Sequence, residues 1–215
     1  MKRKFFAAFL SLCMVMSLVP MTALAAPEND GAGTPSTQAA TELPGAVDGV
    51  ITLTGPVDLK NAWKPEENVT LNLNGNTLTL PRLDAENGVT IIITDSQNGD
   101  GKIVATGTNS AVVRSGGTLV LEDGTITSTS ENLSNSSNIA IFNMGTFTIE
   151  GGKVEGGTNG GTGVYNTVRN NDIYIETPVI CNIEGGEIEA SYGVCAFGPG
   201  VPDGDLSKVK NDQVT

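Results

Sequence analysis

The chain has 215 residues, with 12 Lys and Arg, 24 Asp and Glu and no His, a length that suits one or two domains. Without His, Ser-His-Asp and Cys-His catalytic arrangements and His-ligated metal sites are excluded. The formal net charge of −12 repels phosphate backbones, so we expect no nucleic-acid partner.

The first 25 residues have the pattern of a secretory signal peptide. Residues 2–4 (Lys-Arg-Lys) are positive, residues 5–19 form an apolar run, and residues 23–25 (Ala-Leu-Ala) form a small-x-small cleavage pattern. The apolar run approaches the length of a membrane span, but Pro20 and the cleavage pattern favour a signal peptide. We therefore predict a secreted or cell-surface protein without a transmembrane segment in its mature chain. Removing the three basic residues changes the net charge from −12 to −15.

Residues 26–45 separate the predicted signal peptide from the rest of the chain. They are rich in Ala, Thr, Gly and Pro and contain almost no large apolar residue. Such a segment buries too little apolar surface to offset the entropy that ordering costs. We expect a flexible leader here, with the ordered part starting near Ala46.

A repeated pattern sets the predicted architecture. In each copy two apolar residues alternate with polar ones, a turn with Gly or Asn follows, and another apolar residue comes after the turn. Successive copies lie 20 to 34 residues apart, a step that suits one coil of a solenoid. One copy aligns only if residues 96–100 are a small insertion. The paired apolar residues are Leu71/Leu73, Ile91/Ile93, Leu119/Leu121, Phe147/Ile149 and Cys181/Ile183.

The alignment of the copies predicts how they pack. No window has a 3.6-residue apolar period, which excludes helical repeats, and an antiparallel sandwich would need no likeness between copies. In a parallel β-helix, equivalent positions stack about 4.8 Å apart and tend towards like residues. We predict an all-β fold, a single-stranded right-handed parallel β-helix (solenoid) of about five to six coils over residues 46–197. Its core should contain one continuous column of Leu73, Ile93, Leu121, Ile149 and Ile183.

The segments GTLVLEDGTI, GTFTIEGGKV and NIEGGEI resemble pectate-lyase-like β-helix repeats, above all those of secreted, adhesin-like surface proteins of Gram-positive anaerobic bacteria. The resemblance covers about residues 47–197 and implies the fold. It says little about function, because that superfamily contains lyases, hydrolases and binding proteins. Its enzymes typically use Asp-bound Ca²⁺ and an Arg or Lys base. The basic residues of the coils lie beside no Asp pair at an equivalent position, so no catalytic residue is assigned; they are Arg82, Lys102, Arg114, Lys153 and Arg169.

Two acidic features are candidate cation sites. Glu122, Glu150 and Glu184 occupy one position of the repeat, so stacking places three carboxylates along one edge. There they either bind a cation such as Ca²⁺ or remain exposed and screened by solvent. Asp95 and Asp100 lie in a polar turn with closely spaced oxygen donors, although the turn lacks the spacing of an EF-hand loop. Apart from Ca²⁺ at these residues, we expect no cofactor.

Aromatic side chains that can stack on sugar rings are the remaining candidates. Trp63, Tyr174 and Tyr192 lie outside the predicted core, and a solenoid offers shallow faces that suit extended ligands. We predict a non-catalytic adhesin or glycan-binding module whose partner is an extracellular polysaccharide or host glycan. Two alternatives stay open: a polysaccharide lyase or glycoside hydrolase, since acidic residues are plentiful, and a structural stalk of a larger surface protein.

The C-terminal part of the chain carries two cysteines and a polar tail. Cys181 and Cys195 are either buried free thiols or a disulfide, which an exported location allows. Residues 198–215 are rich in Gly, Pro and charges, so they form a poor cap for the last coil. We therefore predict a truncation at this end, or self-association through an open C-terminal coil.

Overall fold

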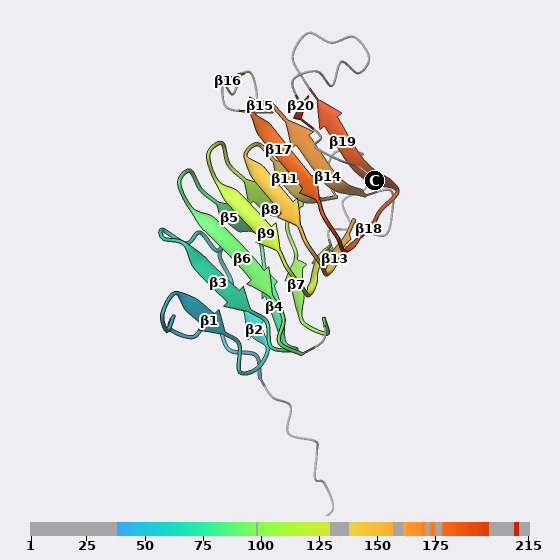
Figure 1. Cartoon of the computed structure of the whole chain (residues 1–215). Coiled ribbons are helices and arrows are strands. Elements are labelled where there is room, and N and C mark those ends of the chain that lie inside the picture. The colour runs from blue at the N-terminus through green and yellow to red at the C-terminus, as the bar shows by residue number, and fades with distance from the viewer. Residues whose placement is uncertain are drawn as a thin grey trace, which may run out of the picture. The chain divides into compact units, whose positions relative to one another are not determined.

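The computed structural model describes residues 38–97, 99–129, 138–156, 161–170, 173–174, 178–197 and 209–210, all within the unit Thr37–Thr215. The predicted signal peptide, residues 26–37 of the predicted leader, and residues 198–208 and 211–215 of the predicted tail lie outside the described residues. Every regular element that the structure describes is a β-strand. All but one short pair belong to three parallel sheets, here named S1, S2 and S3 (Figure 1).

The three sheets share the strands in a regular order. S1 contains β1 (Val50–Thr52), β3 (Val69–Asn72), β6 (Thr90–Thr94), β9 (Thr118–Leu121), β12 (Thr146–Ile149), β17 (Val179–Ile183) and β20 (Val209–Lys210). S2 contains β2 (Val57–Asp58), β4 (Thr77–Leu80), β7 (Lys102–Ala105), β10 (Thr125–Ser128), β13 (Lys153–Glu155) and β18 (Glu187–Glu189). S3 contains β5 (Leu83–Ala85), β8 (Asn109–Val113), β11 (Ile139–Asn143), β14 (Thr162–Thr167) and β19 (Tyr192–Phe197). The remaining pair, β15 (Arg169–Asn170) and β16 (Ile173–Tyr174), is antiparallel.

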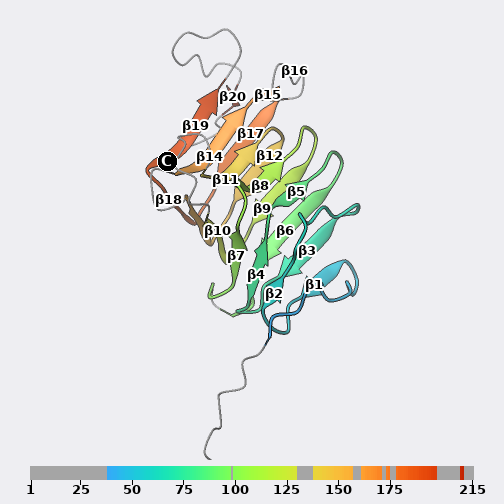
Figure 2. The ribbon, with the colours of Figure 1, turned by 180° about the vertical axis from the view of Figure 1, so that it is seen from behind.

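The chain winds as a right-handed parallel β-helix. It passes through S1, S2 and S3 in turn and returns to S1, so neighbouring strands of a sheet come from successive coils (Figure 1 and Figure 2). We number the coils by their S1 strand, from β1 in the first to β17 in the sixth. In the first coil a single bridge between Trp63 and Leu83 takes the place of an S3 strand. The predicted all-β parallel β-helix of five to six coils is confirmed.

Inward side chains of the three sheets fill the core. In S1, Leu119 pairs with Phe147 and Phe147 pairs with Cys181, and all three are buried. In S2, one apolar residue of each coil forms a column in register: Val57, Leu78, Ile103, Ile126, Val154 and Ile188. Burying one such aliphatic side chain contributes about 1.5–3 kcal/mol, so the stacked columns hold successive coils together.

The register of the second coil differs from the predicted alignment by two residues. Ile93 pairs with Leu71, not with Leu73 as predicted. Leu73 follows the strand, where its N–H donates to the carbonyl oxygen of Thr94, and it is still fully buried. A shift of two residues keeps every side chain on its own face of a strand, so apolar alternation could not distinguish the two registers. The other members of the predicted column do pair in register: Ile93, Leu121, Ile149 and Ile183.

Glycines at the corner between S1 and S2 let successive coils approach closely. Gly152 has a φ of +69°, a left-handed conformation that glycine adopts without steric penalty. A Cβ on Gly152 would lie 2.4 Å from the carbonyl oxygen of Gly124, the equivalent glycine of the coil before. Gly186 repeats the conformation in the next coil, with a φ of +73°. The Gly-containing turns of the repeat are therefore required by the stacking itself.

The ordered part begins before Ala46, inside the predicted leader. Ala40 forms a parallel bridge with Val57 of β2, with backbone hydrogen bonds on both sides of Ala40. Leu43 packs against the core. The composition of this segment indicated a leader because small and polar residues dominate it. One strand-like bridge and one leucine are nevertheless enough to place residues 38–45 on the first coil.

One inward polar side chain is held by three hydrogen bonds. Asn143, in β11, is fully buried. Its Nδ2 donates to Oδ1 of Asn166 in the next coil and to the carbonyl oxygen of Ile180, both at 2.8 Å. Its Oδ1 accepts the N–H of Gly145 at 3.0 Å. A buried amide is tolerated when it is paired in this way, and Asn143 thus ties S3 to S1.

Candidate functional site

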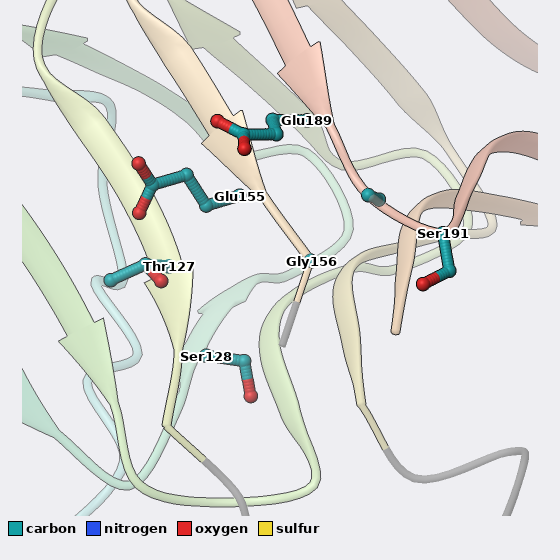
Figure 3. A pocket seen from close by; sticks show the side chains of 7 residues that line it. Thr127, Ser128, Glu155, Gly156, Glu189 and Ser191 are labelled. Atoms are coloured by element: carbon teal, nitrogen blue, oxygen red, sulfur yellow. The ribbon is translucent and has the colours of Figure 1, made fainter. Parts of the chain in front are cut away.

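A surface hollow lies where the chain leaves S2 and turns towards S3 in the fourth, fifth and sixth coils. Its volume is about 510 Å³, and Figure 3 shows Glu155 and Glu189 on neighbouring strands with their carboxylates on the same side. Carboxylates, hydroxyls and backbone line it, and these groups hydrogen-bond to polar, hydroxylated ligands. The lining residues are Thr127, Ser128, Glu155, Gly156, Glu189, Ala190 and Ser191.

The register of S2 brings the polar groups of the hollow together. Thr127 in β10 pairs with Glu155 in β13, and Glu155 pairs with Glu189 in β18. Adjacent strands lie about 4.8 Å apart, so three consecutive coils each contribute one outward polar side chain. The site was not predictable from sequence spacing, because these residues are far apart along the chain and become neighbours only through the strand register.

Lys153 dominates the electrostatics beside the hollow. Its Nζ contacts Oε2 of Glu189 at 2.5 Å and Oε1 of Glu155 at 3.2 Å. The hydrogen bond to Glu189, with that to Glu155, raises the pKa of Lys153 above its ordinary value. In turn the hydrogen bond from Lys153 lowers the pKa of Glu189. Glu189 is therefore ionised at neutral pH, and Lys153 holds both carboxylates in place.

Tyr192, a predicted sugar-contact residue, is a neighbour in the sequence of the residues that line the hollow. It directly follows Ser191, which lines the hollow, and it begins β19. Tyr192 is 61% exposed, whereas most large apolar residues of the described coils are buried. A tyrosine ring offers an apolar face for stacking and a hydroxyl group for hydrogen bonding, although Tyr192 is not itself among the residues that line the hollow.

The other two predicted sugar-contact residues lie elsewhere. Trp63 is half-buried and packs against the core in the first coil. Tyr174 belongs to β16, where its backbone pairs with Arg169 of β15. Neither residue is among those that line the hollow in the described part of the chain.

The predicted glutamate column is present in three consecutive coils. Glu122, Glu150 and Glu184 each follow an S1 strand, and each donates its backbone N–H to a carbonyl of the coil before. All three are exposed. Among the described residues, no group of three or more Asp, Glu, Cys or His side chains is arranged to hold a metal ion. Cation binding at this column, and at Asp95 and Asp100, stays a prediction.

The two acidic residues of the long S1–S2 turn differ in their surroundings. Asp95 is buried, and both of its carboxylate oxygens accept backbone N–H groups of the turns around it. Asp100 is exposed. The Asp95 carboxylate thus fixes the turn by accepting hydrogen bonds from backbone N–H groups.

Acidic and basic side chains also converge at β5, the first strand of S3, although no spacing in the sequence indicated this cluster. Asp84 is fully buried. Its two carboxylate oxygens accept hydrogen bonds from Nε and Nη2 of Arg82, at 2.8 and 2.9 Å. Nζ of Lys64 lies 3.2 Å from Asp84 Oδ2, and Nη2 of Arg114 lies 3.9 Å from Oδ1. These residues come from the first, second and third coils, so the network ties these coils together.

Cys181 and Cys195 are free thiols. Of the two alternatives that the sequence left open, the structure therefore has free thiols and not a disulfide. Cys181 is buried in the S1 column, and burial raises its pKa. Cys195 is half-buried in β19, in register with Tyr165 of β14, and burial raises its pKa as well. The nucleophilic form of cysteine is the thiolate, and burial disfavours that form at both residues.

Comparisons with known proteins add no assignment. No family model, no curated protein and no solved structure matches the chain. In the part of the chain that the structure describes, no helix is long and apolar enough to cross a membrane.

Proposed function

We propose that this protein is an exported, non-catalytic module that binds a polysaccharide in the hollow beside Tyr192. One observation carries the proposal: an exposed aromatic residue follows directly on a hollow lined by carboxylates and hydroxyls. Sugar rings have an apolar face that stacks on aromatic rings and hydroxyl groups that donate to carboxylates. Because three coils contribute equivalent positions to the hollow, it suits an extended chain better than a compact ligand.

Export and a surface location are supported by the sequence. Residues 1–25 have the pattern of a signal peptide, and the repeats resemble those of pectate-lyase-like, adhesin-like surface proteins of Gram-positive bacteria. A protein with that location meets polysaccharides outside the cell. The net charge of −15 that remains once residues 1–25 are removed favours a neutral polysaccharide over an acidic one, because like charges repel.

The electrostatics beside the hollow favour binding over hydrolysis. A glycoside hydrolase needs one carboxyl group whose pKa is raised, so that it can protonate the leaving oxygen. Lys153 instead lowers the pKa of Glu189 and forms an ion pair with Glu155. An ionised Glu189 accepts hydrogen bonds from sugar hydroxyls well and donates a proton poorly.

A glycan array probed with the protein and its variants tests the binding site. Tyr192→Ala removes the ring and should weaken binding to the polysaccharides that the wild type retains by on the order of tenfold. Tyr192→Phe keeps the ring and should bind nearly as well as the wild type. Val47→Ala, at another exposed apolar residue, is the matched control and should change nothing. Equal binding by Tyr192→Ala and the wild type would contradict the proposed site.

Product analysis separates binding from catalysis. The protein is incubated with each bound polysaccharide, with and without Ca²⁺, and the chain lengths are measured afterwards. We expect unchanged chain lengths. Release of oligosaccharides, or of unsaturated products that absorb in the ultraviolet, overturns the non-catalytic part of the proposal and leaves the binding site standing.

A further inference from the structure

The S2 side of the hollow carries an excess of negative charge that the two preceding strands of S2 do not share. Lys153 pairs in register with Glu187, and Glu155 with Glu189. The outward positions of β13 and β18 thus hold three carboxylates and one ammonium group, which leaves two negative charges without a compensating cation. The same positions of β7 and β10 contain no acidic residue: they are Lys102, Val104, Thr125 and Thr127.

Lys153 leaves both carboxylates of the hollow accessible. Its Nζ contacts only one oxygen of each carboxylate, Oε1 of Glu155 and Oε2 of Glu189. The side chain of Lys153 is 27% exposed, against 33% for Glu155 and 67% for Glu189. Lys153 does not itself line the hollow, which continues from Glu155 to Gly156, and the two carboxylates lie on the same side (Figure 3). A ligand in the hollow therefore meets carboxylates rather than the ammonium group.

A buried acceptor without a donor lies at the same corner of the solenoid. Asn138 is 7% exposed, and its Oδ1 accepts no hydrogen bond from any group that the structure describes. Its carbonyl oxygen accepts the N–H of Thr162, as that of Gly161 accepts the N–H of Tyr192. Asn138, Gly161 and Ser191 thus hold the same place in three consecutive coils, and Ser191 lines the hollow. An unpaired buried acceptor is costly, so this corner favours a ligand that supplies hydrogen-bond donors.

These groups have the chemistry that recognises a cation rich in donors. Ionised carboxylates and amide oxygens accept hydrogen bonds and donate none, whereas an ammonium group has three donors and no acceptor. Hydrogen bonds from ammonium to carboxylate are about twice as strong as those between neutral groups. We propose that the polysaccharide bound in the hollow carries free amino groups, whose ammonium forms pair with Glu155 and Glu189. Because it rests on the proposed function, this inference names only the class of polysaccharide bound there.

Calorimetric titration with a matched pair of oligosaccharides tests the preference. The probes are a chitin oligosaccharide and the same oligosaccharide with every N-acetyl group removed, so that only the amine differs. At about pH 6, where the sugar amines are protonated, we expect the deacetylated probe to bind on the order of tenfold more tightly. The preference should shrink at about pH 8 as the amines lose their protons. Glu189 is ionised at both pH values, because the hydrogen bond from Lys153 lowers its pKa.

Substitutions of single glutamates separate recognition from a general attraction of an acidic protein for cations. Glu155→Gln keeps the side-chain shape and removes the charge, so it should reduce the preference for the deacetylated probe several-fold, and Glu189→Gln should act in the same way. Glu67→Gln, at an exposed glutamate before β3, changes the net charge equally and should keep the wild-type preference. An equal reduction by Glu67→Gln and Glu155→Gln would mean that charge alone attracts the probe, and it overturns the inference.

Three outcomes separate the amino-group preference from polysaccharide binding itself. If both probes bind equally and Tyr192→Ala weakens both, the hollow binds polysaccharide but does not select amino groups, and the inference is overturned. If Glu155→Gln removes a clear preference and Tyr192→Ala changes nothing, the role of the carboxylates is confirmed and the aromatic contact of the proposed function is wrong. If neither probe binds and the glycan array retains no polysaccharide, both proposals are overturned.

Discussion

The carboxylate of Asp95 accepts the backbone N–H of Gly75, in the preceding coil, at an N···O distance of 2.7 Å. Its other oxygen accepts the N–H of Gly101, at the far end of the same turn, also at 2.7 Å. Burial raises the pKa of the Asp95 carboxyl, but hydrogen bonds from the backbones of Gly101, Gly75, Gln97 and Gly99 outweigh burial and hold that pKa below its ordinary value. One side chain thus joins the S1–S2 turns of two coils.

Replacing this carboxylate should destabilise the protein in a pH-dependent way. We expect Asp95→Asn to lower the free energy of unfolding by about 1.5–3 kcal/mol at pH 7, since its hydrogen bonds are charge-assisted. Because the folded-state pKa is lowered, the stabilisation is present above the unfolded-state pKa of about 3.9 and is lost as the pH falls through the folded-state value. Urea unfolding at pH 7 and pH 3 should show the gap between wild type and variant narrowing. Asp100→Asn, in the same turn but exposed, is the control, and a gap of equal size at both pH values contradicts the account.

Two isoleucines of one S1 column should differ in how much they contribute to the free energy of unfolding. Ile149 is fully buried, whereas Ile183, its partner in the sixth coil, is only partly buried. We expect Ile149→Ala to cost about 2–5 kcal/mol and Ile183→Ala clearly less, because water already reaches part of the latter side chain. Denaturant unfolding at low protein concentration measures both. Equal losses would show that the sixth coil is covered as completely as the fifth.

The network around Asp84 should contribute to stability, unlike the exposed ion pair of the first coil. We expect Asp84→Asn to cost about 2–3 kcal/mol, because the buried carboxylate accepts charge-assisted hydrogen bonds from Arg82. Asp58→Asn, which removes the exposed partner of Lys60, is the matched control and should change stability by less than about 1 kcal/mol. The Asp84→Asn loss should persist at high salt, since buried pairs are screened little. Thermal unfolding in low and high salt checks both expectations. If high salt abolished the stability difference between wild type and Asp84→Asn, the Asp84 ion pairs would be exposed to solvent and not buried.

The buried amide of Asn143 should be harder to replace than an outward one. Asn143→Ala leaves the N–H of Gly145 and the carbonyl oxygen of Ile180 without the amide that pairs with them, so we expect a loss of about 2–3 kcal/mol. Asn182→Ala removes one hydrogen bond to Thr148 on the outer face of S1 and should cost about 1 kcal/mol or less. Urea unfolding ranks the two variants. A larger loss of stability in Asn182→Ala than in Asn143→Ala would show that the hydrogen bonds of Asn143 do not hold S3 and S1 together.

The fold was predictable because the repeat carries two independent signals. Alternation of apolar residues indicated the S1 strands, and glycine at a fixed position after each strand indicated the corner that Gly152 and Gly186 form. The second-coil register was not predictable, since a shift from Leu71 to Leu73 leaves the alternation unchanged. The S2 strands were predicted only as single apolar residues, because each is two to four residues long and its outward positions are polar.

The candidate site was far less predictable than the fold. Glu155 and Glu189 belong to different copies of the repeat, and only the S2 register makes them neighbours. Likewise, no Asp pair lies beside Arg82 or Arg114 at an equivalent position of the repeat, whereas both side chains approach the single buried carboxylate of Asp84. A contact within one strand can be read from spacing, but a contact between coils depends on how many residues each corner holds.

The glycine contacts at the S1–S2 corners have a consequence for how this chain changes in evolution. Gly124, Gly152 and Gly186 each pack against a backbone carbonyl of the coil before, so the fourth, fifth and sixth coils repeat the same contact at this corner. Duplication of one whole coil in this region therefore repeats the corner contact with the same backbone geometry. Insertions smaller than a coil are accommodated at corners, as residues 96–100 and the β15–β16 pair are. At this corner the solenoid can thus lengthen in steps of one coil.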